Sequence, residues 1–198
     1  HRCPKCGLLR TQLHESPRHL LRTYYSSEYF TGRKSRAGYA DYLNDQKVIE
    51  RNANMFLELI SHHLHSFTHK RLLDVGCATG TFMRQAAVQG FRVAGVDVSK
   101  FAVNQARKDF PRQLHHGTLA TAKFKSGSFD LITFFDVFEH LPSPRQDLLH
   151  CHRLLNRHGL LVINTGNTAS LMAKLEGSNW HYFIPPQHLF FYSQNNFY

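Results

Sequence analysis

Acidic residues, cysteines and long apolar runs are scarce in this sequence. Its 198 residues include 14 Asp and Glu and four cysteines. No apolar run approaches the ~18 residues that a membrane-spanning helix needs, so we expect no membrane span. Four cysteines give no disulfide framework at this length, so we expect a reduced, cytoplasmic protein. The sequence contains neither an internal repeat nor a low-complexity segment.

The composition is that of a folded, basic domain. Aromatic residues make up 13% and hydrophobic residues 42%, which argues against intrinsic disorder. A chain of this length is typical of one domain and buries roughly 70% of the surface that its unfolded form exposes. The 24 Lys and Arg give a formal net charge of +10, which favours nucleic acid, a phosphorylated metabolite or a membrane surface as partner. The charges are scattered, so a basic surface without a partner fits equally well.

Hydrophobic periodicity predicts one helix followed by alternating strands and helices. Apolar residues recur at helical spacing from Ile49 to Leu64, and Asp41 or Asn44 is placed to cap the start of this helix. We then expect strands at 71–75, 91–96, 114–116, 129–135 and 160–164, and helices at 81–89, 99–110, 144–155 and 169–175. This alternation predicts an α/β, Rossmann-like fold with a mainly parallel sheet and helices on both faces.

The most informative segment joins the first of these strands to its helix and includes Asp74, Gly76 and Gly80. The two glycines let the backbone pass close to a ligand, because neither has a Cβ. The helix N-terminus behind them offers N–H groups to a carboxylate. Asp97 ends the next strand, where a carboxylate can accept hydrogen bonds from both hydroxyls of a ribose. A structural reading is also open: the glycines permit a tight turn, and Asp97 is favoured near a helix N-terminus.

Two cofactor classes fit this outline. A dinucleotide-binding turn has the pattern G-x-G-x-x-G, whereas this chain has G-x-A-x-G shortly after Asp74. The Asp74 carboxylate would repel a pyrophosphate, and this disfavours a nicotinamide cofactor. The same carboxylate suits a cofactor that has a cationic amino group and a sulfonium. The segment resembles the first motif of the class I S-adenosylmethionine-dependent methyltransferases, an acidic residue followed by G-x-G-x-G.

The resemblance extends over residues ~40 to 198. The segments 129–132 and 135–141 resemble the family's fourth-strand motif, and 159–164 resembles its fifth strand. Residues 180–189 resemble a substrate-side segment of the small-molecule methyltransferases of sugar, antibiotic and quinone pathways. The resemblance implies a methyltransferase domain at 41–198 behind an N-terminal segment at 1–40. It also implies that the family's C-terminal hairpin is missing from this chain.

The resemblance places the cofactor residue by residue. The methionine end of S-adenosylmethionine would bind the Gly-rich turn, and Asp97 would hold the ribose. Val98 would pack against adenine, near backbone groups at Leu119, and Phe135 and Asp136 would lie beside the reactive methyl group. S-adenosylhomocysteine would be the product. The expected cofactor-binding residues are Asp74, Gly76, Cys77, Gly80, Asp97, Val98, Leu119, Phe135 and Asp136.

A hydroxyl acceptor needs a base, and histidine is the natural base near neutral pH. We predict that His140, after the fourth strand, or His188, in a Pro-bounded loop, is catalytic, with His181 as a third candidate. His140 and His188 also fit as hydrogen-bonding residues that fix turns. The nucleobase-methylating turn [D/N]-P-P-[Y/F] and a Pro-Cys nucleophile do not follow the fourth strand. Methylation of a small sugar, antibiotic or quinone-type acceptor is therefore favoured, and the basic surface would suit an acceptor with an anionic group. The alternatives are an RNA methyltransferase and a non-catalytic cofactor-binding module.

The first 40 residues resemble a partial zinc ribbon. Cys3 and Cys6 form a C-x-x-C-G zinc-knuckle pattern, and we expect them to bind zinc. His14 and His19 could complete four ligands, and in the resembled subgroup an upstream C-x-x-C pair supplies the others. A half-site with unligated thiols is the alternative.

An aromatic cluster follows this pattern, made of Tyr24, Tyr25, Tyr29 and Phe30. It resembles the aromatic lid of the same subgroup. Its rings would either stabilise the sulfonium by cation–π attraction or anchor the lid on the core. Residues 193–198 resemble the start of the helix that precedes the family's C-terminal hairpin, so we expect a sequence trimmed at both ends.

Overall fold

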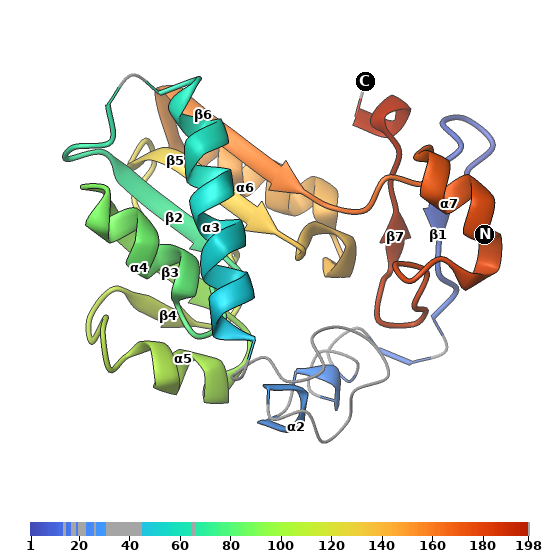
Figure 1. Cartoon of the computed structure of the whole chain (residues 1–198), viewed down its shortest axis with the longest axis horizontal. Helices are drawn as coiled ribbons and strands as arrows, with labels where there is room; N and C mark the ends of the chain where they lie inside the picture. The colour runs from blue at the N-terminus through green and yellow to red at the C-terminus, as the bar shows by residue number, and fades with distance from the viewer. Residues whose placement is uncertain are drawn as a thin grey trace.

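Five parallel strands form a central sheet (Figure 1). The computed structural model describes residues 1–13, 15–16, 19, 23–25, 27–30, 45–64 and 66–197. The strands are β2 (Arg71–Val75), β3 (Arg92–Asp97), β4 (Leu114–His116), β5 (Phe129–Phe135) and β6 (Leu155–Asn164). They lie in the order β4-β3-β2-β5-β6, and each neighbouring pair is parallel. The chain therefore proceeds from the central strand β2 first to one edge and then to the other, which creates a switch point between β2 and β5.

Helices cover both faces of this sheet. The α-helices are α2 (Ser27–Phe30), α3 (Gln46–Ser61), α4 (Thr81–Val88), α5 (Lys100–Ala106), α6 (Pro144–Leu154) and α7 (Leu171–Glu176). The described residues also form the short 3₁₀ helices η1 (Phe138–His140), η2 (Gly177–Asn179) and η3 (Gln194–Phe197). In α3 the buried residues are Ile49, Ala53, Leu57 and Ile60. Their spacing of three and four residues gives the helix one apolar face toward the sheet.

The core has two halves because successive side chains of a strand point to opposite faces. Leu72 of β2 and Leu131 of β5 pack with α3 and α4. Their neighbours Leu73 and Ile132 pack on the other face, with Leu154 of α6. Each strand thus contributes to both halves, which is why the runs that form β2 and β5 are almost continuously apolar.

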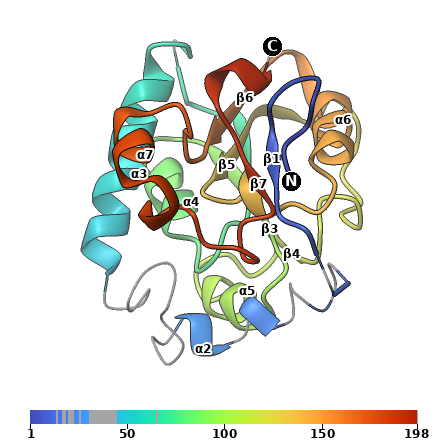
Figure 2. The same ribbon diagram turned by 90° about the vertical axis from the view of Figure 1, so that its right-hand side faces the viewer.

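A second, two-stranded sheet lies beyond the carboxyl ends of β5 and β6, at the right in Figure 1. It pairs β1 (Leu9–Arg10) with β7 (Phe190–Phe191) in antiparallel register. Thr11 extends this pairing, because its Oγ1 donates a 2.7 Å hydrogen bond to the carbonyl oxygen of His188. Figure 2 looks onto this end of the molecule and shows β1 and β7 side by side.

The fold class expected from the sequence is confirmed. β6 begins earlier than expected, at Leu155, and α5 ends earlier, at Ala106, before a series of turns. The pairing of β1 with β7 was not predicted, because two-residue strands leave no periodicity. The proposed caps Asp41 and Asn44 lie outside the described residues. Within the described ranges, no helix is long and apolar enough to cross a bilayer.

The contact of β2 with α3 and α4 can be tested by truncating Leu72, which is fully buried. We expect Leu72→Ala to lower the free energy of unfolding by about 2–5 kcal/mol, because it removes buried methyl groups and leaves a cavity. Leu171→Ala is the matched control: Leu171 on α7 is 73% exposed, and its truncation should change stability by less than about 0.5 kcal/mol. Urea denaturation measures both, and equal losses would contradict the assignment of Leu72 to the core.

Candidate functional site

A pocket opens at the carboxyl ends of β2, β3 and β5, beside the switch point of the sheet. Ligands of open α/β sheets bind at this position. The strand ends, helix α3 and the rings of Tyr25, Tyr29 and Phe30 contribute to its lining. The residues with most bearing on chemistry are Tyr25, Tyr29, Phe30, Phe56, Asp74, Gly76, Cys77, Asp97, Val98, Leu119, Phe135, Asp136 and His140.

The turn after β2 has a left-handed backbone at three positions, with φ of 77° at Gly76, 45° at Ala78 and 80° at Gly80. A Cβ on Gly76 would overlap the side chain of Val137, so this turn packs directly against the segment that follows β5. A Cβ on Gly80 would instead meet the Cβ of Ala106 and the ring of Phe110. Gly80 therefore serves the packing of α4 on α5, and it does not line the pocket.

Asp97 connects the turn after β2 to the end of β3. Its Oδ2 accepts a 2.8 Å hydrogen bond from the backbone N–H of Ala78, and its Oδ1 accepts a 2.7 Å bond from that of Ser99. Each carboxylate oxygen has two lone pairs, so both can accept a further donor from the pocket. On the adjacent strand, Asp74 Oδ1 accepts a 2.8 Å hydrogen bond from Thr133 Oγ1.

Asp74 and Asp97 bring two buried carboxyl groups to one pocket. Burial raises the pKa of Asp74 to about 7 and also raises the pKa of Asp97. Neither takes part in an ion pair with any described residue. Because an uncompensated buried charge is costly, this side of the pocket favours a ligand with a positive charge and hydrogen-bond donors.

Aromatic rings form the opposite side of the pocket. Phe135 stacks on Phe56 of α3, with ring centroids 4.2 Å apart. Tyr25 meets the ring of His140 edge-on at 5.7 Å. The Tyr25 hydroxyl is buried and has no hydrogen-bond partner among the described residues. An unpartnered buried hydroxyl is costly, so it is a natural contact for a polar atom of a ligand.

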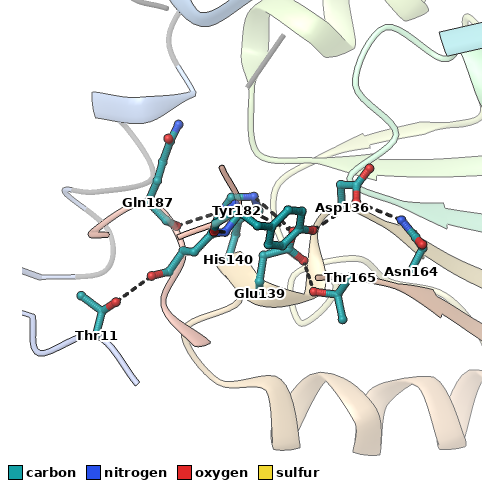
Figure 3. Close-up of polar contacts among 9 residues, drawn as sticks. Thr11, Asp136, Glu139, His140, Asn164, Thr165, Tyr182 and Gln187 are labelled. Carbon is teal, nitrogen blue, oxygen red and sulfur yellow. Dashed lines mark hydrogen bonds and ion pairs between the residues drawn. The ribbon is translucent and has the colours of Figure 1, made fainter. Parts of the chain in front are cut away.

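A polar network lies next to this aromatic side (Figure 3). Glu139, 1% exposed, accepts hydrogen bonds from Tyr182 at Oε1 and from Thr165 Oγ1, at 2.8 Å, at Oε2. The Tyr182 hydroxyl also lies 3.1 Å from Asp136 Oδ1, which accepts a 2.9 Å bond from Asn164. Burial raises the pKa of Glu139 and raises that of Asp136 to about 6. Two carboxyl groups thus share one network, in which Glu139 is buried and Asp136 is exposed.

His140 and His188 lie together at the edge of this network, with ring centroids 4.5 Å apart. Nδ1 of His140 is 2.8 Å from the carbonyl oxygen of Gln187, and Nδ1 of His188 is 2.7 Å from that of Tyr182. Burial lowers the pKa of both rings, that of His188 to about 3. Both histidines are therefore neutral near pH 7, and each carries its hydrogen on Nδ1, since a carbonyl oxygen only accepts.

The structure brings most of the predicted site residues together. All the expected cofactor residues except Gly80 line the pocket, and of the two predicted bases only His140 does. His188 is buried behind His140. Sequence reasoning missed Glu139 and Tyr182 as site residues. Glu139 could have been noticed because it is an acidic residue in a mostly apolar motif, directly before the predicted base His140. That its carboxylate is buried follows only from the fold.

Cys3 and Cys6 both have free thiols. Hydrogen bonds from the backbone of Cys6 and Lys5 lower the pKa of Cys3. Among the described residues, no third His, Cys, Asp or Glu joins these cysteines in a metal-binding group. His14 lies outside the described residues, and His19 faces Glu15 at 3.5 Å. Zinc binding by Cys3 and Cys6 stays a prediction.

The packing of the turn on Val137 generates a stability prediction. Gly76→Ala should lower the free energy of unfolding by about 2–4 kcal/mol, because it adds a clash to the strain of a left-handed backbone. Gly127→Ala is the matched control, since Gly127 has φ of 63° but nothing within 4 Å of an added Cβ. It should cost only about 1 kcal/mol. Chemical denaturation compares them, and equal losses would show that Val137 does not fix the turn.

Comparison with known proteins identifies the family to which this chain is similar. The family described as "Methyltransferase domain" matches residues 46–198. A ubiquinone biosynthesis O-methyltransferase of Nitrosococcus oceani is 32% identical over 117 residues, which cover 56% of this chain and 49% of that protein. The enzyme of the same description from Pasteurella multocida is 29% identical over 138 residues, or 62% of this chain and 57% of that protein. The chain thus spans about half the length of the curated relatives that it matches.

Solved structures agree on the fold. Magnesium protoporphyrin IX methyltransferase from Synechocystis with bound SAH matches with a TM-score of 0.66 and 18% identity, over 91% of this chain and 85% of that chain. A SAM-dependent methyltransferase from Archaeoglobus fulgidus matches with a TM-score of 0.62 and 18% identity, over 86% of this chain and 67% of that chain. At this identity, the likeness extends to the fold alone.

Proposed function

Since the chain belongs to the methyltransferase-domain family, we propose that it transfers the methyl group of S-adenosylmethionine to a hydroxyl of a small-molecule acceptor. The observation that carries this proposal is the pair of buried carboxyl groups, Asp74 and Asp97, at the ends of adjacent parallel strands. The relatives described as O-methyltransferases support oxygen as the acceptor atom. A neighbour of the same fold with bound SAH supports the choice of cofactor.

The residues of the pocket fit this cofactor. Asp97 keeps lone pairs for two ribose hydroxyls, and Asp74 matches a cationic amino group. The turn from Gly76 to Ala78 passes below them without bulky side chains, and Val98 and Leu119 give an apolar surface for adenine. Phe135 ends β5, Asp136 follows it, and both line the part of the pocket where we place the acceptor.

S-adenosylmethionine, when bound, supplies an electrophilic methyl group, so the protein has to hold the acceptor in line and manage its proton. We place the acceptor hydroxyl on the His140 side of the pocket. His140 donates through Nδ1 to Gln187, which leaves its Nε2 as the predicted proton acceptor. The aromatic rings of the opposite side would keep water away from the reacting atoms. His188, behind His140, is a positioning residue in this proposal.

The lining also bears on the kind of acceptor. Its described residues include no lysine or arginine, whereas Tyr25, Tyr29, Phe56 and Phe135 all contribute rings. An apolar, ring-containing acceptor such as a quinone-type metabolite fits this lining better than RNA or a phosphorylated sugar. As the compartment, we propose the cytoplasm, because all four cysteines are free thiols.

The cofactor assignment is tested by calorimetric titration with S-adenosylmethionine and S-adenosylhomocysteine. We expect wild type to bind both, and Asp97→Asn to bind roughly 10–100-fold more weakly, because hydrogen bonds to a charged group are lost. Asp109→Asn is the control, since Asp109 lies in an exposed ion pair with Arg84. It should bind as wild type does. Absence of binding by folded wild type would overturn the cofactor assignment, and an unchanged Asp97→Asn would overturn the ribose role.

The raised pKa of Asp74 predicts pH-dependent binding. In the folded, ligand-free protein the pKa is about 7 rather than 3.8, so the carboxyl is largely protonated at pH 6. A cationic ligand favours the ionised form and lowers the pKa, so binding releases a proton. Affinity should therefore rise with pH, by up to about tenfold per unit below about pH 7, and level off above about pH 8. Asp74→Asn should lose this rise in calorimetry, and an equal slope in both proteins would exclude Asp74 as its source.

A further inference from the structure

Three side chains outside the cofactor residues converge behind His140. Glu139, His140 and His188 each place one potential ligand atom within 4.8 Å of the others, and among the described residues no other group of this kind occurs. Nε2 of each histidine lies 3.9 Å from Oε1 of Glu139. Two ligands of a tetrahedral zinc ion, each about 2.0–2.1 Å from the metal, are roughly 3.3 Å apart. Each of these two oxygen–nitrogen separations would have to shorten by roughly half an ångström to reach the ligand spacing of a zinc ion.

The two rings are already oriented as metal ligands. Each directs Nδ1 at a backbone carbonyl, that of Gln187 for His140 and that of Tyr182 for His188. The hydrogen therefore lies on Nδ1, and the lone pair lies on Nε2, which is 3.9 Å from Oε1 of Glu139 in both rings. Metal-binding histidines hold their other ring nitrogen in this way, which fixes the tautomer and the ring orientation.

The charges around Glu139 also favour a bound cation. Glu139 is almost fully buried, and Asp136 joins it through Tyr182 (Figure 3). Among the described residues, the basic side chains nearest to Glu139 are these two histidines, which carry their hydrogens on Nδ1 and so bring no charge, and no lysine or arginine faces it. Buried carboxylates are normally paired with a cation or coordinate a metal. Hydrogen bonds from Tyr182 and Thr165 orient the carboxylate but bring no net charge.

We propose that Glu139, His140 and His188 bind a divalent transition-metal ion. Zinc suits two imidazoles and one carboxylate best, and three protein ligands leave a position open. Since His140 lines the pocket, the ion would lie at the pocket wall.

Its role there rests on the proposed methyl transfer, although its binding does not. The ion would bind the acceptor oxygen and lower the pKa of the hydroxyl. With the ion bound, the lone pair of His140 Nε2 would no longer be available as the proton acceptor that the proposed function assigns to it, so the hydroxyl proton would leave to a water molecule instead. The O–CH₃ bond forms as the S–CH₃ bond breaks, and the electron pair of the broken bond stays on sulfur.

The test is calorimetric titration of the chelator-treated full chain with zinc chloride. Cys3→Ser and Cys6→Ser are present in every protein, so that their thiolates do not contribute. We expect one tight ion per chain, and at least roughly tenfold weaker binding in His140→Gln, His188→Gln and Glu139→Gln. His140 is the most exposed of the three side chains, so its variant bears the least risk to folding. The control is His181→Gln: His181 is exposed and lies 3.8 Å from Glu176, a pair without a third ligand. It should bind as the parent does.

Circular dichroism establishes that each protein is folded. A folded parent that binds no zinc, or a folded His140→Gln variant that binds it as tightly as the parent, would overturn the proposal. S-adenosylmethionine binding is measured on the same samples. Cofactor binding without zinc binding overturns the metal site and leaves the proposed function intact, whereas zinc binding by a parent that fails to bind the cofactor overturns the proposed function.

Discussion

All strands of the central sheet run in the same direction, and the site depends on this. Parallel strands bring their carboxyl ends to one edge, and the strand order reverses between β2 and β5. Residues far apart in the sequence, such as Asp74, Asp97 and Asp136, therefore meet around one pocket. The hydrogen bonds of Asp97 to Ala78 and Ser99 then hold two of these strand ends in fixed relation.

The pocket has two polar regions, each with a pair of carboxyl groups that accept hydrogen bonds from neutral donors. Asp97 accepts hydrogen bonds from two backbone N–H groups and Asp74 accepts one from Thr133, and burial raises the pKa of both. Glu139 and Asp136 accept theirs from side chains, and they share the Tyr182 hydroxyl as a donor. Neutral donors lower the cost of burying a carboxylate without cancelling its charge. Both regions thus favour a positively charged occupant.

The sequence predicted the central sheet well because its strands have strong local signals. The sequence alone identifies the apolar runs of β2 and β5, the glycines between β2 and α4, and Asp97 at the end of β3. The sequence did not predict the environment of three other residues. Gly80 matched the motif but packs between helices; His188 matched the chemistry of a base but is buried behind His140; and Glu139 carried no sign that its carboxylate is enclosed. Each depends on which elements meet in space, and one sequence does not encode that in a local pattern.

The small sheet of β1 and β7 joins segments that are distant along the chain. Thr11 bonds to His188 across a separation of 177 residues, and the loop that orients both histidines lies directly before β7. β1 leaves the ribosome well before β7, and a domain generally folds as a unit once its segments are available. The cofactor side, from β2 to β5, has its strands available well before residues 182–191 exist. The part of the pocket around His140 therefore cannot be completed until these residues have been synthesised, and β1 stays without its partner until then.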